Sequence, residues 1–449
     1  MEYHEALAAL SARGRFGIRL GLGRTRALLR AMGDPQLALR GALVAGTNGK
    51  GSVLALAASA LRAAGVRVGE TPKPHLVSYR ERIAVDGVPI SVADFSRHVE
   101  AVLALADVVA RRHGEPTEFE LLTAVVFRHF AEADLDVALV EVGLGGRLDA
   151  THAWDGGVAV VTNVDLDHMD RLGPTIAAIA REKAAIIERG DVAVTGADGE
   201  GLDIIRRRAQ RMGAPLAEVR PAPILGWDRD SLQVELPRLG AVRVGLRGRH
   251  QAANVAVADA LLDALEIAGI VTAGPDARRT GYASARWPGR LELLTVGDGR
   301  ELLLDGAHNP AGAAALAEAL DDLRPYLAGG PLTFVLGSMV DKDVDGVIDA
   351  LAAADSMHGA TIIATSVDVP RALGADDLAG RWEARRADRG IAAVEAIHDP
   401  LAAVDRALER PGPTVVAGSL YLVGAIRAHL VDDPLLRDPE PPAPAETSP

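Results

Sequence analysis

The stretch Val44-Ala45-Gly46-Thr47-Asn48-Gly49-Lys50-Gly51-Ser52 decides how the rest of the chain is interpreted. It follows a short apolar run at 42–45 and precedes a helix-prone run at 53–64. Glycines let backbone N–H groups turn toward an anion, and a helix N-terminus favours negative charge. Lys50 can reach outer phosphates, and Ser52 can offer a hydroxyl to Mg²⁺. Many glycine-rich turns are only tight turns, but lysine and serine at these places favour a phosphate-binding loop.

The bulk composition limits the class of protein. With 449 residues, 49 % of them apolar, the chain is long enough for two domains. A net charge of −13 argues against a nucleic-acid partner, and the absence of cysteine excludes disulfides, thiolate chemistry and Fe–S ligation. The start lacks the pattern of a signal peptide, and no apolar run is long enough to span a bilayer. We therefore expect a cytoplasmic protein with no membrane or nucleic-acid partner.

Lysine is unusually scarce in this chain. Of the 48 lysine and arginine residues only four are lysine, which leaves 44 arginines. Those four are Lys50, Lys73, Lys183 and Lys342. In a chain whose surface cations are mostly arginine, we expect a lysine at positions that need a compact ammonium or a free amine. Chance retention is the alternative for any single one of them.

Strands and helices alternate through the first half of the chain. Expected strands lie at 42–45, 66–69, 136–141, 157–162 and 191–195. Expected helices lie at 24–32, 53–64, 92–112, 121–132 and 175–188, and flexible loops at 20–24 and 143–149. Two prolines give 71–75 an extended path. Glu141 ends one strand and suits a carboxylate near Mg²⁺. The alternation predicts a mainly parallel sheet covered on both faces.

The second half repeats this pattern after a change of character. Alternating valines at 223–246 predict a small antiparallel patch, a helix follows at 250–268, and 280–289 has no clear period. A second series then places strands at 301–305, 332–336, 360–365, 392–397 and 414–417, with helices at 312–323, 344–353, 375–387 and 401–409. The predicted fold class is α/β, with an N-terminal P-loop-type domain and a smaller Rossmann-like C-terminal domain. The expected limits are 1–284, a linker at 285–290, 291–431, and a disordered tail at 432–449.

Together the motifs resemble those of folylpolyglutamate synthase, which often doubles as dihydrofolate synthase and belongs to the Mur-ligase superfamily. The matching segments are 45–52, 74–76, 141–151, 167–168, 181–184, 248–251, 305–310 and 418–420. They occur in consistent order over residues 15–430. The resemblance implies an ATP- and Mg²⁺-dependent acid–amino-acid ligase of folate biosynthesis, polyglutamylation and one-carbon metabolism. Such an enzyme would add L-glutamate to tetrahydrofolate, and to dihydropteroate, as its small-molecule substrates. A monomer is expected.

The resemblance also implies residue roles in the nucleotide and metal site. The nucleotide would be held by Gly46, Thr47, Asn48, Gly49, Lys50, Gly51, Ser52, Asn254, Arg290 and Asp305. Ser52, Glu141 and His168 match metal ligands. Lys183 matches a lysine that the family carboxylates to a carbamate, although a helix-surface cation beside Glu182 is the alternative from the residues alone. Lys50, Lys183 and His308 would be the catalytic residues, with His308 facing the reacting centre.

Substrate contacts and a mechanism follow from the same resemblance. The folate substrate and the incoming glutamate would meet Arg24, His75, Phe119, Asp149 and Ser419. The substrate carboxylate would attack the γ-phosphate of ATP to give an acyl phosphate, and the amine of glutamate would then displace phosphate. Water must be excluded from both steps, and closure of the second domain about residues 287–289 would exclude it.

The chain departs from the family pattern at two positions. Lys73 stands where the family has a serine that ligates magnesium, and an ammonium cannot ligate a cation. Our hypothesis is that Lys73 places its charge near the phosphates and weakens binding of one metal ion. His152 replaces an asparagine, which alters the local substrate contacts. The alternative function is a nucleotide-binding paralogue without ligase turnover. Lys50, Glu141, His168 and Lys183 are all present, which argues against that alternative.

Overall fold

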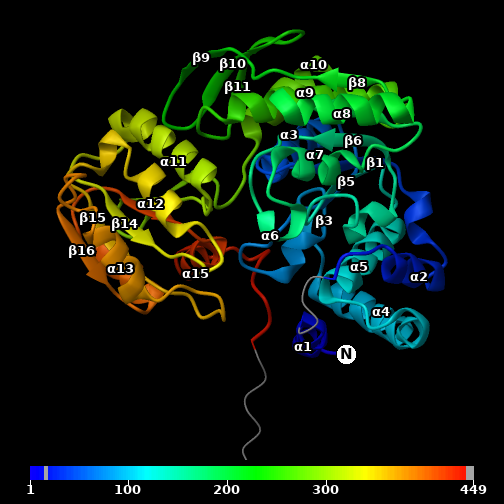
Figure 1. The fold of residues 1–449 in the computed structure, drawn as a ribbon, viewed down its shortest axis with the longest axis horizontal. Helices are drawn as coiled ribbons and strands as arrows, with labels where there is room; N and C mark the ends of the chain where they lie inside the picture. Colours follow the sequence, from blue (N-terminus) through cyan, green and yellow to red (C-terminus); the bar gives the residue numbers. More distant parts are fainter. Residues whose placement is uncertain (15–18, 441–449) are drawn as a thin grey trace, which may run out of the picture.

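The computed structural model describes residues 1–14 and 19–440. It contains two α/β bodies that lie side by side, with the N-terminal one blue to green and the C-terminal one yellow to orange (Figure 1). This arrangement confirms the predicted fold class. The strands of the larger sheet all precede residue 219, and those of the smaller sheet all follow residue 291. Where the chain divides into domains stays a prediction.

In the described part of the chain, the larger sheet has eight strands in the order β4-β3-β2-β5-β1-β6-β7-β8. Strand β1 (Gly41–Ala45) lies between β5 (Val137–Glu141) and β6 (Gly157–Val161), parallel to both. The others are β2 (Val68–Thr71), β3 (Ala84–Val85), β4 (Val88–Pro89), β7 (Val192–Thr195) and β8 (Leu216–Glu218). Strand β3 alone runs in the opposite direction, antiparallel to its neighbours β2 and β4. The carboxyl ends of β2, β5, β1 and β6 therefore meet at one edge, which is where open α/β sheets bind ligands.

Helices cover both faces of this sheet, as predicted. They are α1 (Tyr3–Gly14), α2 (Gly23–Ala31), α3 (Lys50–Ala63), α4 (Val92–His113), α5 (Glu118–Glu132), α6 (Met169–Leu172), α7 (Ile176–Ala184) and α8 (Gly199–Met212). Separate apolar clusters pack on the two faces, one around α4 and α5 and the other around α3 and α9 (Gln251–Ile267). Strands buried on both faces explain the nearly continuous apolar runs in the sequence.

Several helix limits differ from the sequence expectation. Helix α5 begins three residues early because Thr117 accepts the amide of Glu120 in a capping box. Gly23 and Arg24 belong to α2, not to a flexible loop. Helix α7 ends at Ala184 instead of continuing to 188. Helix α8 was not anticipated, although its buried Ile204, Ile205 and Ala209 follow a helical period.

A small antiparallel sheet follows, as predicted, with β9 (Ile224–Trp227), β10 (Leu232–Leu236) and β11 (Gly240–Val244). The expectation of an irregular segment at 280–289 was wrong for its first half, because α10 (Pro275–Ser284) covers it. Gly281 of α10 packs so closely on the backbone of Ala60 in α3 that a Cβ would collide there. The Tyr282 hydroxyl donates to Asp259 at 2.9 Å. Tertiary packing therefore makes this helix where the local pattern is weak.

Within the described residues, the C-terminal sheet has six strands in the order β12-β13-β17-β14-β15-β16. They are β12 (Glu292–Val296), β13 (Arg300–Leu304), β14 (Thr333–Leu336), β15 (Thr361–Ala364), β16 (Ala393–Ala396) and β17 (Thr414–Ala417). The helices are α11 (Pro310–Leu323), α12 (Val344–Leu351), α13 (Ala375–Glu383), α14 (Pro400–Leu408) and α15 (Leu420–Leu430). Strand β12, which is antiparallel to β13, and helix α15 were not expected. No described helix is long and apolar enough to cross a membrane.

The two bodies also touch through β9 and the loop that follows it. The Tyr326 hydroxyl donates to the carbonyl of Trp227 at 3.1 Å, and Arg229 donates to the carbonyl of Tyr326 at 3.0 Å. Arg249 forms two hydrogen bonds of 2.7 Å with Asp322 on α11. The small antiparallel sheet is therefore part of the contact between the two bodies.

The segment after α15 differs from the disordered tail that its composition predicts. Its described part, 432–440, returns to the N-terminal body, where Asp438 pairs with Arg80 at 2.9 Å. Residues 441–449, which belong to the same expectation, lie outside the described residues, as do residues 15–18 at the start of the resembling region. A buried arginine supplies the partner that composition alone cannot reveal.

Candidate functional site

The loop between β1 and α3 needs glycine for both conformation and space. Gly49 has φ 80°, and a Cβ there would collide with the Asn254 amide. A Cβ at Gly46 would collide with the Thr162 side chain. A Cβ at Gly51 would lie 2.8 Å from the Trp287 ring, so the segment that joins the two bodies packs directly on this loop.

The backbone amides of the loop divide into two groups. Those of Thr47 and Asn48 donate to the Asn163 side chain at 3.1 and 2.9 Å. Those of Lys50, Gly51 and Ser52 start α3 and find no acceptor among the described residues. Free amides at a helix N-terminus form an anion-binding site. The anion-binding part of the loop therefore begins at the helix start, three residues earlier than the helix-prone run indicated.

Two lysines converge on one carbonyl of this loop. Lys50 Nζ donates to Gly46 O at 3.1 Å, and Lys183 Nζ donates to the same oxygen at 2.8 Å. Lys183 comes from α7 and its side chain is buried, so it is not a helix-surface cation. Burial and the charge of Lys50 lower the pKa of Lys183 to about 7. A substantial fraction of this side chain is therefore a neutral amine at neutral pH.

Glu141 is buried at the carboxyl end of β5, beside β1. Its Oε2 accepts the backbone amide of Lys73 at 3.0 Å, and its Oε1 accepts no hydrogen bond within the described chain. Burial raises the pKa of this carboxyl group, and the charge of Lys50 opposes that shift. The carboxylate therefore has a free oxygen next to the cationic loop.

Lys73 does not face the phosphate loop, contrary to our hypothesis. Its Nζ donates to the backbone carbonyl of Glu141 at 2.7 Å and lies 4.6 Å from the centre of the Phe119 ring. Burial lowers the pKa of Lys73 to about 8, and the charges of Asp149 and Glu141 oppose that shift. The ammonium is therefore directed toward the residues expected to contact the folate substrate.

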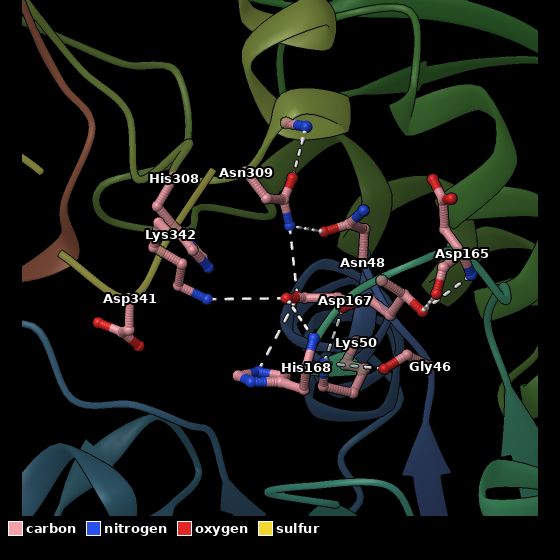
Figure 2. A network of polar contacts seen from close by, with 12 residues as sticks. Gly46, Asn48, Lys50, Asp165, Asp167, His168, His308, Asn309, Asp341 and Lys342 are labelled. Carbon is pink, nitrogen blue, oxygen red and sulfur yellow. Dashed lines mark hydrogen bonds and ion pairs between the residues drawn. The ribbon is translucent and has the colours of Figure 1, made fainter. Parts of the chain in front are cut away.

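Asp167 is the centre of a polar network between the two bodies. It lies after β6, and its carboxylate is 3.7 Å from Lys342 Nζ and 3.9 Å from His168 Nε2. The Asn309 side chain donates to Asp167 at 3.4 Å and to Asn48 at 3.5 Å. Figure 2 shows Asn309 and Lys342 reaching this carboxylate from the C-terminal body. These contacts place the carboxyl-terminal edges of the two sheets opposite each other.

The C-terminal body supplies its polar side chains from the ends of adjacent strands. Asn309 follows β13, Lys342 follows β14 and Ser419 follows β17, and β17 lies between the other two. Asn309 and Ser419 also cap α11 and α15 through their side chains. His308 donates from Nδ1 to Gly306 O at 2.8 Å, and burial lowers its pKa to about 4. The ring is therefore neutral, and its Nε2 is free to accept.

Three of the expected nucleotide contacts have clear structural partners. Asn254 on α9 donates to Gln251, which in turn donates to Ser52 Oγ at 3.5 Å. Asp305 accepts the backbone amides of Leu291 and Ala307. Burial raises the pKa of Glu141, and the charge of Arg290 is one of the weaker effects that oppose this shift, so its guanidinium lies within electrostatic reach of the phosphate-loop edge.

The expected substrate residues are not all free to contact a ligand. Arg24 is held by Glu120 through two bonds of 3.0 and 2.9 Å, and Asp149 accepts the amides of Leu144 and Thr151. These two side chains hold local structure. His75 accepts Arg82 Nε at Nδ1 and stacks on Tyr79 with ring centres 4.2 Å apart. The pKa of His75 is lowered to about 3 by burial and by Arg82, so the neutral ring carries its proton on Nε2.

The described side chains bring together no cluster of three histidine, cysteine, aspartate or glutamate residues suited to a metal ion. Glu141 contacts Lys73, His168 lies beside Asp167, and Ser52 contacts Gln251. The three expected metal ligands therefore share no direct contact. Two of them, Glu141 and His168, lie within electrostatic reach of Lys50: its charge opposes the rise that burial causes in the pKa of Glu141 and adds to the fall that burial causes in the pKa of His168.

Sequence reasoning missed Asp167, Asn163, Asn309 and Lys342 as site residues. Lysine scarcity was the available signal for Lys342, because the four lysines are the only ones in the chain and all four lie at this site. Asn163 and Asp167 directly follow a predicted strand, which is a weaker signal. Their partners lie too far away in the sequence to be identified by spacing.

The fold and this site define an ATP-dependent ligase of the Mur type: a sequence profile described as the Mur ligase middle domain matches residues 44–262. A second profile, the C-terminal domain of dihydrofolate synthetase, matches residues 291–429. The chain belongs to the family of folylpolyglutamate and dihydrofolate synthases.

Individual relatives support this assignment over nearly the whole chain. A dihydrofolate synthase/folylpolyglutamate synthase of Bacillus subtilis is 34 % identical over 95 % of this chain and 99 % of its own. A folylpolyglutamate synthase of Mycobacterium tuberculosis, solved with ADP and AMPPCP, has a TM-score of 0.83 at 32 % identity and covers 98 % of this chain and 100 % of its own. A Yersinia pestis relative, solved with AMPPNP and Mn, has a TM-score of 0.79 at 30 % identity, covering 96 % and 98 %.

Proposed function

We propose that this protein joins L-glutamate through an amide bond to the terminal carboxylate of tetrahydrofolate, and to dihydropteroate, at the expense of ATP. One observation carries the proposal. A cationic loop that starts α3 faces the strand ends of a second α/β body, and Asn309 and Lys342 bridge the two. A ligase that activates a carboxylate and then admits an amine needs such a site between two bodies, because the activated intermediate must be kept from water.

The loop residues 46–52 bind the phosphates of ATP. The free amides at Lys50, Gly51 and Ser52 supply hydrogen bonds, and Lys50 neutralises charge on the outer phosphates. Asn254, Arg290 and Asp305 hold the rest of the nucleotide. Two of these residues come from the joining segment and the C-terminal body, so binding of ATP favours association of the two bodies.

The residues present also fit a divalent metal ion. Glu141 has a buried carboxylate oxygen without a hydrogen bond, and oxygen ligands suit Mg²⁺. Glu141, His168 and Ser52 would hold the ion, which supplies charge neutralisation at the transferring phosphoryl group.

Lys183 has the chemistry required for carboxylation. Its neutral amine adds to CO₂, forming one N–C bond and releasing one proton, and the lysine becomes a carbamate anion. The amine lies 2.8 Å from Gly46 O and carries a lowered pKa, so the reactive neutral form is populated. The new negative charge would lie beside Lys50 and the loop, where it helps to order the metal site.

The substrates approach from opposite sides of the loop. Phe119 and His75 contact the folate, Asp149 and Arg24 hold the local structure on that side, and Ser419 lies on the glutamate side. The neutral His308 accepts a hydrogen bond at Nε2 from the incoming amine. The substrate carboxylate attacks the γ-phosphate to give an acyl phosphate and ADP, and the amine then displaces phosphate. A cytoplasmic monomer completes the proposal.

Glutamate-dependent phosphate release tests this function. Purified protein is given ATP and Mg²⁺, with dihydropteroate in one assay and tetrahydrofolate in another, and the product is identified by mass. Release with both substrates supports the dual activity, and release with one narrows it. If neither substrate gives release above Lys50→Met, while ATP still binds, the protein is a nucleotide-binding paralogue without turnover.

A further inference from the structure

The segment 432–440, here termed the strap, links the end of the C-terminal body to the N-terminal body. It follows α15, and Figure 1 shows it in red, passing between the two bodies. Asp438 accepts Tyr3 OH at 2.9 Å, Ser78 Oγ at 2.8 Å and Arg80 Nε at 2.9 Å. Tyr3, Ser78 and Arg80 are all buried. Three donors from buried side chains make this a defined docking point.

Arg80 also binds the backbone of the strap. Its NH2 group donates to the carbonyls of Leu435 at 2.9 Å and Arg437 at 3.1 Å. Its NH1 group donates to Ile90 O at 3.2 Å, which ties the arginine to the N-terminal body. A planar guanidinium can serve several acceptors in fixed directions, and lysine cannot replace it in this role.

The strap docks on the loop that carries His75. Within residues 74–82, the Glu81 carboxylate accepts the backbone amides of Leu76, Val77 and Ser78 at 2.6–3.1 Å. Arg82 of the same loop binds His75 Nδ1 at 2.8 Å. Because the loop is internally bonded in this way, a constraint on Ser78 and Arg80 is also a constraint on His75.

A second part of the C-terminal body holds the same loop. Gly424 of α15 packs so closely on Leu76 O that a Cβ would collide with it, and Leu76 also packs against the C-terminal core that contains Val423. The loop 74–82 is therefore held by α15 at one end and by the strap at the other. Its position depends on the C-terminal body although it belongs to the N-terminal sequence.

We propose that Arg80 and Asp438 are positioning residues for the folate substrate. The docked strap fixes loop 74–82, so that His75, the proposed folate contact, keeps its place, and neither Arg80 nor Asp438 contacts substrate itself. This inference rests on the proposed function for its kinetic consequence, but its structural consequence is independent of turnover. It goes beyond a structural anchor, because it predicts a change in substrate affinity.

Hydrogen exchange measures the structural consequence in the full-length protein. Asp438→Ala is expected to raise the exchange rates of the amides of Leu76, Val77 and Ser78 about tenfold, because a charge-assisted contact to buried donors is lost. The matched control is Asp432→Ala, which removes only the ion pair with Arg437 on the same segment. The proposal is overturned if the amides of the loop exchange at the same rate in both variants and in the parent.

Steady-state kinetics measures the consequence for substrate. Asp438→Ala is expected to raise KM for dihydropteroate about tenfold while kcat changes less than about twofold, because positioning is lost and the reacting groups remain. Asp438→Glu should restore most of the affinity. Arg80→Met combined with Asp438→Ala should raise KM by less than the product of the two single effects, because the two variants share the loss of the Arg80–Asp438 contact.

The possible outcomes separate the two proposals. A parent protein without ligase turnover overturns the proposed function, and the exchange result then still decides whether the strap orders the loop. An active parent whose Asp438→Ala variant has loosened loop amides but unchanged KM overturns the positioning role. If Arg80→Met fails to fold, the comparison of Asp438→Ala, Asp438→Glu and Asp432→Ala still decides, because Asp438 lies on the partly exposed strap.

Discussion

Lys342 Nζ lies 3.7 Å from Asp167 Oδ1 and joins the two bodies directly at the phosphate-loop edge. Both side chains are largely shielded, with 16 % and 17 % of their areas exposed, so solvent weakens this pair less than a surface pair. Burial lowers the pKa of His168 and of His308, and the charge of Lys342 adds to both shifts. One cation thus connects the two bodies and acts on both candidate histidines.

Replacement of Lys342 by methionine tests this connection. Lys342→Met is expected to lower kcat/KM at least about tenfold, because the shielded pair across the contact is lost and Asp167 is left uncompensated. Steady-state ligase assays provide the measurement. The neighbouring Arg371→Met variant, which removes an exposed pair with Asp341, is the control and should change kcat/KM less than about twofold. Equal effects of the two would contradict a special role for Lys342.

Two glycines with similar backbone conformations separate conformational strain from collision. Gly49 (φ 80°) and Gly65 (φ 77°) both adopt left-handed geometry, but only a Cβ at Gly49 meets another residue, Asn254. Gly49→Ala is expected to destabilise the protein by about 2 kcal/mol more than Gly65→Ala. Chemical denaturation measures the difference. Gly49→Ala should also weaken ATP binding in a calorimetric titration, and similar losses in the two variants would contradict this reading.

Lys73 provides a prediction for metal binding. Its ammonium lies beside Glu141, and a cation there opposes the binding of another cation. In the presence of AMPPNP, Lys73→Ser is expected to bind Mn²⁺ about tenfold more tightly than the parent. Paramagnetic detection of free Mn²⁺ gives the affinity without any need for turnover. Lys73→Arg keeps the charge and should resemble the parent, and a serine variant with unchanged affinity would refute the argument.

Asp191, which lies outside the candidate site, makes the free energy of unfolding depend on pH. Burial, together with the nearby Asp155, raises the pKa of Asp191 from 3.8 to about 7. Between these values the folded chain keeps a proton that the unfolded chain has released, so this group's contribution falls as the pH rises from about 4 to 7. Asp191→Asn should remove that fall. At pH 8 the free energy of unfolding of the variant should exceed that of the parent by about 2 kcal/mol.

Urea denaturation at several pH values measures this effect. The control is Asp276→Asn, whose side chain is fully exposed and which should leave the pH profile as it is in the parent. If the free energy of unfolding of Asp191→Asn falls between pH 4 and 7 as steeply as that of the parent, another group causes the pH dependence.

The sequence predicted the fold because its signals were local. The run 44–52 shows strand, glycine turn and helix within nine residues, and the later strands alternate with helices at ordinary spacings. Helix α10 could not be predicted in the same way, because it is held by close packing of Gly281 on α3 and by the buried contact of Tyr282 with Asp259. Tertiary contacts decide such a segment.

The residues of the candidate site could be predicted from the sequence only where they belong to a recognisable motif. Lys50 and Lys183 were expected at the nucleotide site, and the structure brings both to Gly46. The direction of Lys73 was wrong, because a sequence gives the place of a side chain but not the way it turns. Asp167 and Lys342 lie far apart in the sequence and belong to different bodies, so no local pattern pairs them.

Because all four lysines lie at one site, isotope labelling of lysine side chains reports on that site alone. Incorporation of ¹⁵N-lysine would place four ammonium or amine probes in a 449-residue chain, and none would report on any other region. Two of them, Lys50 and Lys183, share one carbonyl acceptor, and Lys342 belongs to the opposite body. A spectrum of four signals would therefore follow nucleotide arrival, carbamate formation and contact between the two bodies separately, without a single engineered tag.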